Sequence, residues 1–153
     1  MAVDVGKARI GIAISDHHAI LASPLATVAR TIELSTCIDE MISLAAKEGE
    51  LLEIYVGLPL NLQGLATEST QDAVQFAQEI AARVSVEVLL IDERLTTSVA
   101  NSQLLAIGKS QKSARSTVDQ MAAVAILEYA LSVEKNSGLV PGLSLTEWRA
   151  KNE

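Results

Sequence analysis

The chain has 153 residues, of which 49% are hydrophobic, 20% charged and 3% aromatic, so we expect one compact domain over 1–153 rather than a disordered chain. Its formal net charge of −7 argues against indiscriminate coating of nucleic acid, which depends on cations that displace counterions from phosphates. No apolar run approaches the roughly 18 residues that cross a bilayer and no secretion signal is visible, which argues against a membrane protein and predicts a cytoplasmic one.

The first expected strand contains a charged residue, Asp4, within the apolar stretch MAVDV. A buried, unpaired carboxylate is costly, so such a residue needs a partner, a metal ion or access to water. Lys7-Ala8 then predicts a turn, and RIGIAIS (9–15) and ASPLATVA (22–29) predict a second and a third strand. Connections this short favour an antiparallel arrangement of the three strands.

A loop and a helix are expected next. The pair His17-His18 predicts an exposed turn between the second and third strands. Apolar residues at helical spacing predict a helix over 34–49, with Gly49 as its C-cap. Cys37 lies in this helix and is the single cysteine, so it can form no internal disulfide and is expected to be a small buried hydrophobic residue.

The rest of the chain alternates strands and helices, which indicates an α/β fold. LLEIYVGLPL (51–60) and VEVLLID (86–92) predict buried strands, and STQDAVQFAQEIAARV (69–84) predicts a helix between them. Two more helices are expected, one over 97–107 and one from Ser116 to about Glu134. The tail over 136–153 is expected to be irregular.

Polar residues fall where three of these strands end. They are Asp4, the segment Pro59-Leu60-Asn61, and the pair Asp92-Glu93. In open sheets with parallel strands, ligands bind at the carboxyl ends of the strands, near the point where the strand order reverses. We therefore expect these residues to meet at one edge of the sheet.

Four segments carry a resemblance to a known family. DVGKARIGIAISD, VGLPLNLQG, DERLTTS and DQMAAVAILEYAL are similar to the four characteristic blocks of the YqgF family, also called RuvX, in the same order and over Asp4 to Leu131. Members are pre-16S rRNA nucleases related to Holliday junction resolvases. The resemblance implies a ribonuclease H-like fold with a mixed five-stranded sheet flanked by helices. It also implies a metal-dependent phosphodiesterase site formed by Asp4, by Glu93 and by Asp119 at the start of the last long helix.

Phosphodiester hydrolysis independently requires such a group of carboxylates. An activated water and a stabilised leaving oxygen can both be supplied by two hard cations about 3.5–4 Å apart. Mg²⁺ prefers carboxylate and water oxygens and usually takes only one or two carboxylates besides substrate phosphate. Mg²⁺ or Mn²⁺ held by three acidic residues is therefore the expected cofactor.

Each of the three acidic residues also has a purely structural interpretation. Asp4 precedes a turn and can bond local backbone amides, and Glu93 can be a surface acid paired with Arg94. Asp92, on the opposite face from Glu93, is expected to cap the following turn. Ser116-Thr117-Val118-Asp119 matches the pattern in which an acid supports the amides at a helix start. Against that, Asp119 shares the apolar face of its helix.

Further residues are candidates for binding the substrate. Asn61, Arg94, Thr96 and Thr97 can contact phosphate or support the carboxylates, and a structural role explains each of them equally well. The basic segment GKSQKSARST carries no acid, so its three cations can follow a phosphate backbone or simply be solvated. These cations are Lys109, Lys112 and Arg115.

Taken together, the sequence favours a metal-dependent endonuclease that acts on structured RNA, in 5′-end processing of precursor 16S rRNA during ribosome biogenesis. A Holliday junction resolvase acting on DNA with the same site is the nearest alternative. A nucleotide-binding module that uses the Asp-x-Gly turn and a non-catalytic RNA-binding factor are the others. No membrane partner is expected, and the sequence makes no prediction of oligomeric state.

Overall fold

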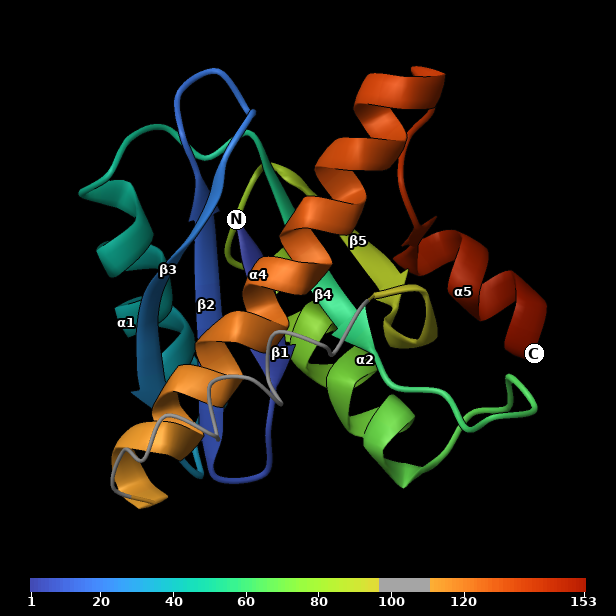
Figure 1. Ribbon diagram of the computed structural model, residues 1–153. Helices are drawn as coiled ribbons and strands as arrows, with labels where there is room; N and C mark the ends of the chain where they lie inside the picture. The colour runs from blue at the N-terminus through green and yellow to red at the C-terminus, as the bar shows by residue number, and fades with distance from the viewer. Residues whose placement is uncertain (97–110) are drawn as a thin grey trace.

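The computed structural model describes residues 1–96 and 111–153, with side chains described from 115 onward in the second range. One mixed sheet of six strands forms its centre, in the order β3-β2-β1-β4-β5-β6 (Figure 1). The strands are β1 Ala2–Val5, β2 Arg9–Ser15, β3 Ala22–Ala29, β4 Glu53–Leu58, β5 Glu87–Asp92 and β6 Leu143–Ser144. The sheet is mixed, as expected, but has one strand more than the five that the family resemblance implied.

Strand directions confirm the prediction of an antiparallel start. β1 pairs antiparallel with β2, and β2 pairs antiparallel with β3. β4 runs parallel to β1, and β5 runs parallel to β4. The carboxyl ends of β1, β4 and β5 therefore lie at the same edge of the sheet, which is where the sequence placed its polar residues.

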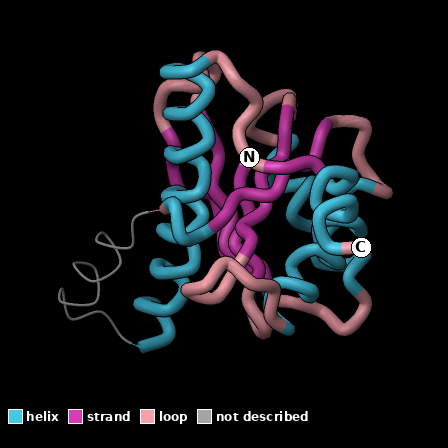
Figure 2. Tube along the Cα trace, turned by 90° about the vertical axis from the view of Figure 1, so that its right-hand side faces the viewer, coloured by secondary structure: helices cyan, strands magenta, loops and turns pink. Residues whose placement is uncertain are grey.

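Helices cover both faces of this sheet. They are α1 Leu34–Ala46, α2 Glu68–Ala81, α4 Gln111–Ser137 and α5 Leu145–Asn152, with a short 3-10 helix η1 over Glu93–Leu95. Figure 2 shows the long helix α4 alone on one side of the sheet and the shorter helices on the other. No described helix combines the length and the apolar character needed to cross a membrane.

Alternating strand residues build two separate cores. Val3 and Val56 point to the side of α1 and α2, where they pack with Phe76, whereas Ala2 and Tyr55 point to α4. Cys37 is fully buried in the first of these cores and forms no disulfide, as predicted. The alternation fixes which face each residue of β1 presents, and so places Asp4 on the same face as Ala2.

Helix α2 is joined to the end of β4 by its first turn. Thr67 and Thr70 form a reciprocal capping box, which satisfies amides that would otherwise have no partner at the start of the helix. The Thr70 hydroxyl, which is fully buried, also donates to the carbonyl of Pro59. These bonds fix the direction in which α2 leaves the edge of the sheet.

The C-terminal segment differs from the irregular tail expected over 136–153. Gly142 has a φ of 76° and lies so close to the Leu90 carbonyl that a Cβ atom would overlap it, which lets β6 pair with β5. Ser144 and Glu147 then form a capping box that starts α5. A strand of two residues has too little periodicity to be predicted from sequence.

The ends of two helices also differ from their predicted positions. Helix α1 ends at Ala46 with Lys47 as its C-cap, two residues before the predicted Gly49. Helix α4 begins at Gln111 rather than Ser116, so Asp119 lies eight residues inside it. The interpretation of Asp119 as an acid near a helix start is therefore wrong, and so is its expected place at the opening of that helix. The helix predicted over 97–107 lies outside the described residues.

Candidate active site

Asp4 lies near the carboxyl end of β1, on the face of the sheet that α4 covers. Its antiparallel partner in β2 is Gly11, which in turn pairs with Thr27 of β3. On the other side, the pairing of Val3 with Val56 places Gly57 of β4 next to Asp4. Asp4 therefore stands between two glycines, in a row of residues that share one face.

Gly11 allows α4 to touch the sheet beside Asp4. A Cβ atom at Gly11 would overlap the backbone carbonyl of Asp119, so the helix backbone lies directly on the strand at this point. Thr27 holds the same turn of the helix, since its hydroxyl donates to the Ser116 carbonyl at 3.1 Å and accepts from Gln120 Nε2 at 3.0 Å. The contact brings Asp119 next to Asp4 although 115 positions separate them in the chain.

Gly57 makes the corresponding space for Glu93. A Cβ atom at Gly57 would lie 2.5 Å from Glu93 Oε1 and 2.7 Å from Ile126 Cδ1. The Glu93 carboxylate thus lies over the glycine that neighbours Asp4, between β4 and α4. A glycine inside a strand often marks a close approach of this kind, so Gly11 and Gly57 could have been noticed in the sequence.

Asp4 interacts electrostatically with each of the other two carboxylates. Burial and then the nearby Asp119 carboxylate raise the pKa of Asp4 to about 6. Burial, followed by the charges of Asp4 and Asp92, raises the pKa of Glu93 to about 7. Within the described residues, neither Asp4 nor Glu93 forms a hydrogen bond or ion pair through its side chain. Two partly buried carboxylates without a cationic partner are suited to a hard cation.

Asp119 differs because it already has a cationic partner. Arg9, the first residue of β2, donates from Nε to Asp119 Oδ2 at 2.8 Å. In the part of the chain that the structure describes, no three acidic, histidine or cysteine side chains stand in a geometry ready to hold a metal ion. The donors fit Mg²⁺ or Mn²⁺ chemically, but Asp119 must turn away from Arg9 to join the other two. Sequence reasoning missed Arg9, although it lies between Asp4 and Gly11 in one motif.

Asp92 has a structural role, as expected. Its carboxylate accepts the backbone N–H of Arg94 at 3.0 Å and pairs with the Arg94 guanidinium at 2.6 Å. These bonds lower the pKa of Asp92. The interpretation of Glu93 as the partner of Arg94 is therefore wrong, because Asp92 takes that role. Glu93 is left to face the site.

The remaining candidates lie around this group or outside the described residues. Asn61 Oδ1 accepts the amides of Gln63 at 3.0 Å and Leu65 at 2.9 Å, and so shapes the loop after β4. Thr96 donates to the carbonyl of Glu93 at 2.8 Å and closes the turn that carries it. Arg115 is exposed near the start of α4. Thr97 and Lys109 and the side chain of Lys112 lie outside the described part of the structure.

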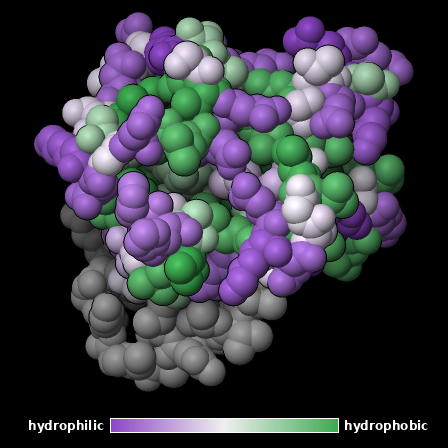
Figure 3. Space-filling model, turned by 90° about the horizontal axis from the view of Figure 1, so that it is seen from above, coloured by the Kyte–Doolittle hydropathy of each residue, from purple (hydrophilic) through white to green (hydrophobic). Residues whose placement is uncertain are grey.

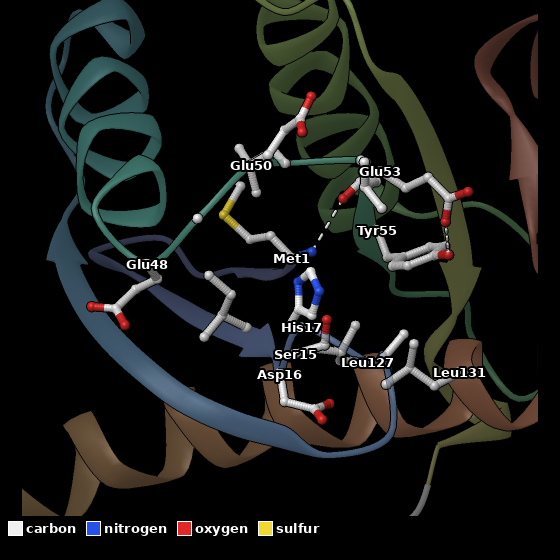
Figure 4. A pocket seen from close by; sticks show the side chains of 15 residues that line it. Met1, Ser15, Asp16, His17, Glu48, Glu50, Glu53, Tyr55, Leu127 and Leu131 are labelled. Atoms are coloured by element: carbon white, nitrogen blue, oxygen red, sulfur yellow. Dashed lines mark hydrogen bonds between the residues drawn. The ribbon is translucent and has the colours of Figure 1, made fainter.

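A separate cavity lies at the opposite end of the sheet. Its volume is about 270 Å³, and it is lined by Met1, Ser15 and Glu53 at the strand ends and by Leu127 and other apolar residues (Figure 4). Figure 3 looks onto this end of the molecule and shows hydrophobic surface gathered in a hollow. Asp4 is at the far end of β1 from Met1, so the cavity is no part of the carboxylate site. His17 also lines the cavity, and both His17 and His18 are exposed as predicted.

The raised pKa values predict how stability depends on pH. Glu93 in the folded protein keeps its proton up to about pH 7, whereas the ordinary pKa is 4.5. The folded state then binds more protons than the unfolded state between these values, so the free energy of unfolding falls as pH rises through that range. We expect wild type to lose stability relative to Glu93→Gln between pH 5 and 8 without metal, by about 3 kcal/mol at most.

Urea unfolding of both proteins in EDTA would measure this difference, and the titrating groups that do not interact with Glu93 cancel because both proteins contain them. A constant difference across pH 5–8 would contradict a buried, repelled carboxylate. Adding Mn²⁺ should flatten the dependence in wild type, because cation binding favours the ionised carboxylate.

Comparison with known proteins gives one family and many relatives. A family model described as RuvX, Holliday junction resolvase, matches residues 1–133. A protein from Clavibacter sepedonicus is 45% identical over 142 residues, which cover 93% of this chain and 88% of that protein. One from Streptomyces coelicolor is 43% identical over 143 residues, which cover 93% of this chain and 84% of that protein. One from Mycobacterium ulcerans is 45% identical over 129 residues, which cover 84% of this chain and 75% of that protein. All three carry the name "Putative pre-16S rRNA nuclease".

Proposed function

Because the chain belongs to the RuvX family, we propose that it is an endonuclease that hydrolyses phosphodiester bonds of structured RNA, with the 5′ end of precursor 16S rRNA as its substrate. The proposal places it in cytoplasmic ribosome biogenesis as a single ribonuclease H-like domain over 1–153. The observation that supports it is that Asp4 lies close to both Asp119 and Glu93, while neither Asp4 nor Glu93 has a cationic partner among the described residues.

Asp4 and Glu93 would hold Mg²⁺ or Mn²⁺, with Asp119 as a third ligand. A bound pair of such cations lowers the pKa of water and stabilises the leaving oxygen of a phosphodiester. Asp4 suits this role because its own pairing with Gly11 of β2, and the pairing of the preceding Val3 with Val56 of β4, hold its backbone in place. Other residues would position these ligands. The turn that Thr96 closes would orient Glu93, and the close contact at Gly11 would determine how near the backbone of Asp119 lies to the sheet.

Several further groups would bind the substrate. Arg9 is 39% exposed and can exchange Asp119 for a phosphate oxygen once a cation takes its place. Asn61 would donate to the substrate from its side-chain nitrogen, because its side-chain oxygen already accepts two backbone amides of its own loop. Arg94, Thr96 and Thr97 lie in the segment after β5, and the cations Lys109, Lys112 and Arg115 would follow the phosphate backbone beyond the site.

The nearest alternative substrate is a DNA junction, which the name of the family model favours. We expect a fragment of precursor 16S rRNA to be cleaved in Mg²⁺ or Mn²⁺ and left intact in EDTA, and a four-way DNA junction of similar length to be cleaved much more slowly. Gel analysis of labelled substrates would measure both rates. Faster cleavage of the junction would replace the proposed substrate, and cleavage in EDTA would exclude the metal-dependent site.

A further inference from the structure

Arg30, the residue after β3, makes two bonds to the turn that joins β1 to β2. Its backbone N–H donates to the carbonyl of Ala8 at 2.9 Å, and its Nη1 donates to the carbonyl of Gly6 at 3.0 Å. The turn consists of Gly6, Lys7 and Ala8, so the single residue that follows β3 holds both of its ends. Neither bond follows from any pattern in the sequence.

The Arg30 side chain is itself fixed in place. Nη1 and Nη2 both donate to the carboxylate of Asp72 on α2, each at 2.7 Å. The two side chains are only 13% and 22% exposed, and the guanidinium carbon lies 5.6 Å from the centre of the Phe76 ring. Asp72 raises the pKa of Arg30, and Arg30 lowers the pKa of Asp72, as expected for a bidentate pair. The guanidinium therefore connects the turn rigidly to α2.

The turn matters because a candidate site residue lies on each side of it. Asp4 lies two residues before Gly6, and Arg9, which holds Asp119, follows Ala8. The turn is also tight: Gly6 N–H donates to the Arg9 carbonyl at 2.9 Å, and a Cβ atom at Gly6 would lie 2.5 Å from that oxygen. A shift of this turn must therefore move Asp4, Arg9 or both.

We infer that Arg30 and Asp72 are positioning residues for the carboxylate site, since they hold the turn that orients Asp4 and Arg9. This inference rests on the proposed nuclease function. The pair lies on the opposite face of the sheet from α4, with the side chains that pack around Phe76, and so acts through the turn and not by contact with the substrate. In metal sites generally, residues that do not touch the metal fix the orientation of the ligands that do, and the pair would act in this way.

Two variants separate this role from a general contribution to stability. Arg30→Lys keeps the charge but loses the planar fork that reaches Gly6 and Asp72 together. Asp72→Asn keeps the shape but loses the charge that fixes the guanidinium. The matched control is Arg83→Lys, because Arg83 also bridges two elements, with Glu79 at 3.0 Å and Asp39 at 3.7 Å, at the far end of α2.

Three measurements should distinguish the variants from the control. Amide exchange of Gly6 should be roughly tenfold faster in both variants, since the turn opens more often. The Mn²⁺ concentration that gives half of the maximal rise in melting temperature should increase roughly 10- to 100-fold, and kcat for RNA cleavage should fall by a similar factor with little change in KM. The double variant should be about as impaired as the worse single one, because both act through one contact.

Arg83→Lys should change none of the three quantities. The inference is overturned if the variants lower the melting temperature but leave Gly6 exchange, the Mn²⁺ midpoint and kcat at wild-type values, because the pair is then only structural. It is also overturned if Gly6 exchange rises while the Mn²⁺ midpoint stays constant, since the turn then does not position the site. Wild type that neither binds Mn²⁺ nor cleaves RNA would instead refute the proposed function, and the inference with it.

Discussion

Replacing Asp4 with asparagine should reduce phosphodiester cleavage by on the order of 10³-fold or more. Asp4 is central to the proposed site, since Gly11 and Gly57 flank it. The Asp119 carboxylate raises the pKa of Asp4, and Asp4 in turn raises the pKa of Glu93. An amide is a poor ligand for a hard cation, and the several kcal/mol of charge stabilisation that a bound metal supplies correspond to a factor of this size. Single-turnover cleavage of precursor 16S rRNA in Mg²⁺ and Mn²⁺ would measure the loss.

The same substitution should not weaken the metal-free fold. Burial and Asp119 raise the pKa of Asp4 to about 6, so at pH 8 its charge opposes folding and removing it should leave stability equal or higher. Metal at about 100 times its dissociation constant should add about 2.7 kcal/mol to the unfolding free energy of wild type, and nothing to the variant. Melting curves with EDTA and with Mn²⁺ would measure both effects.

Asp16→Asn provides the matched control for this substitution. Asp16 accepts the amides of Ile20 at 2.7 Å and Leu21 at 2.8 Å in an exposed loop at the other end of the sheet. This variant should lose stability, because it weakens an acceptor of two backbone amides, and keep the full response to metal. If Asp4→Asn behaved in the same way, with lower stability and an unchanged metal response, Asp4 would be a local structural residue and the proposed site would be wrong.

The second large effect is expected from Gly11→Ala. A single methyl group at this position overlaps the backbone of Asp119, and a helix backbone cannot give way as the end of a side chain can. Overpacking of this kind costs about 3 kcal/mol or more, and relief requires α4 to move away from β2. We expect the variant to unfold at lower urea concentration and to lose most of its cleavage activity, because Asp119 moves with the helix.

Gly57→Ala is the matched comparison, since it makes the same change on the other side of Asp4. Its new methyl group would meet the ends of two side chains, Glu93 and Ile126, which can rotate. Stability should fall less than for Gly11→Ala, while the Mn²⁺ midpoint should still rise because Glu93 is displaced. Equal losses of stability, or a normal metal response in Gly57→Ala, would show that the two glycines do not shape the site in the way we describe.

Most of the regular structure could be predicted from local patterns in the sequence. Two strands, over 9–15 and 22–29, begin and end where they were predicted, because alternation of apolar residues and short turns are local signals. The motifs also indicated the correct family and singled out three carboxylates, of which Asp4 lies close to both Asp119 and Glu93. The structural role of Asp92 at the following turn was also correctly predicted, although Glu93 belongs to η1 and not to β5, so strand alternation is not what separates the two side chains.

The contacts among these residues could not be predicted from the sequence, because they depend on how distant segments pack. The start of α4 was mistaken because Ser116-x-x-Asp119 imitates a helix start, and its true position depends on the fit of the helix against Gly11 and Thr27. The pairing of Arg9 with Asp119 spans 110 positions, and that of Arg30 with Asp72 spans 42. Strand β6 has two residues and exists through its pairing with β5. Contacts between distant segments leave no periodic pattern in the sequence. The carboxylates could therefore be identified from motifs, whereas the residues that hold them in place could be identified only from the packed fold.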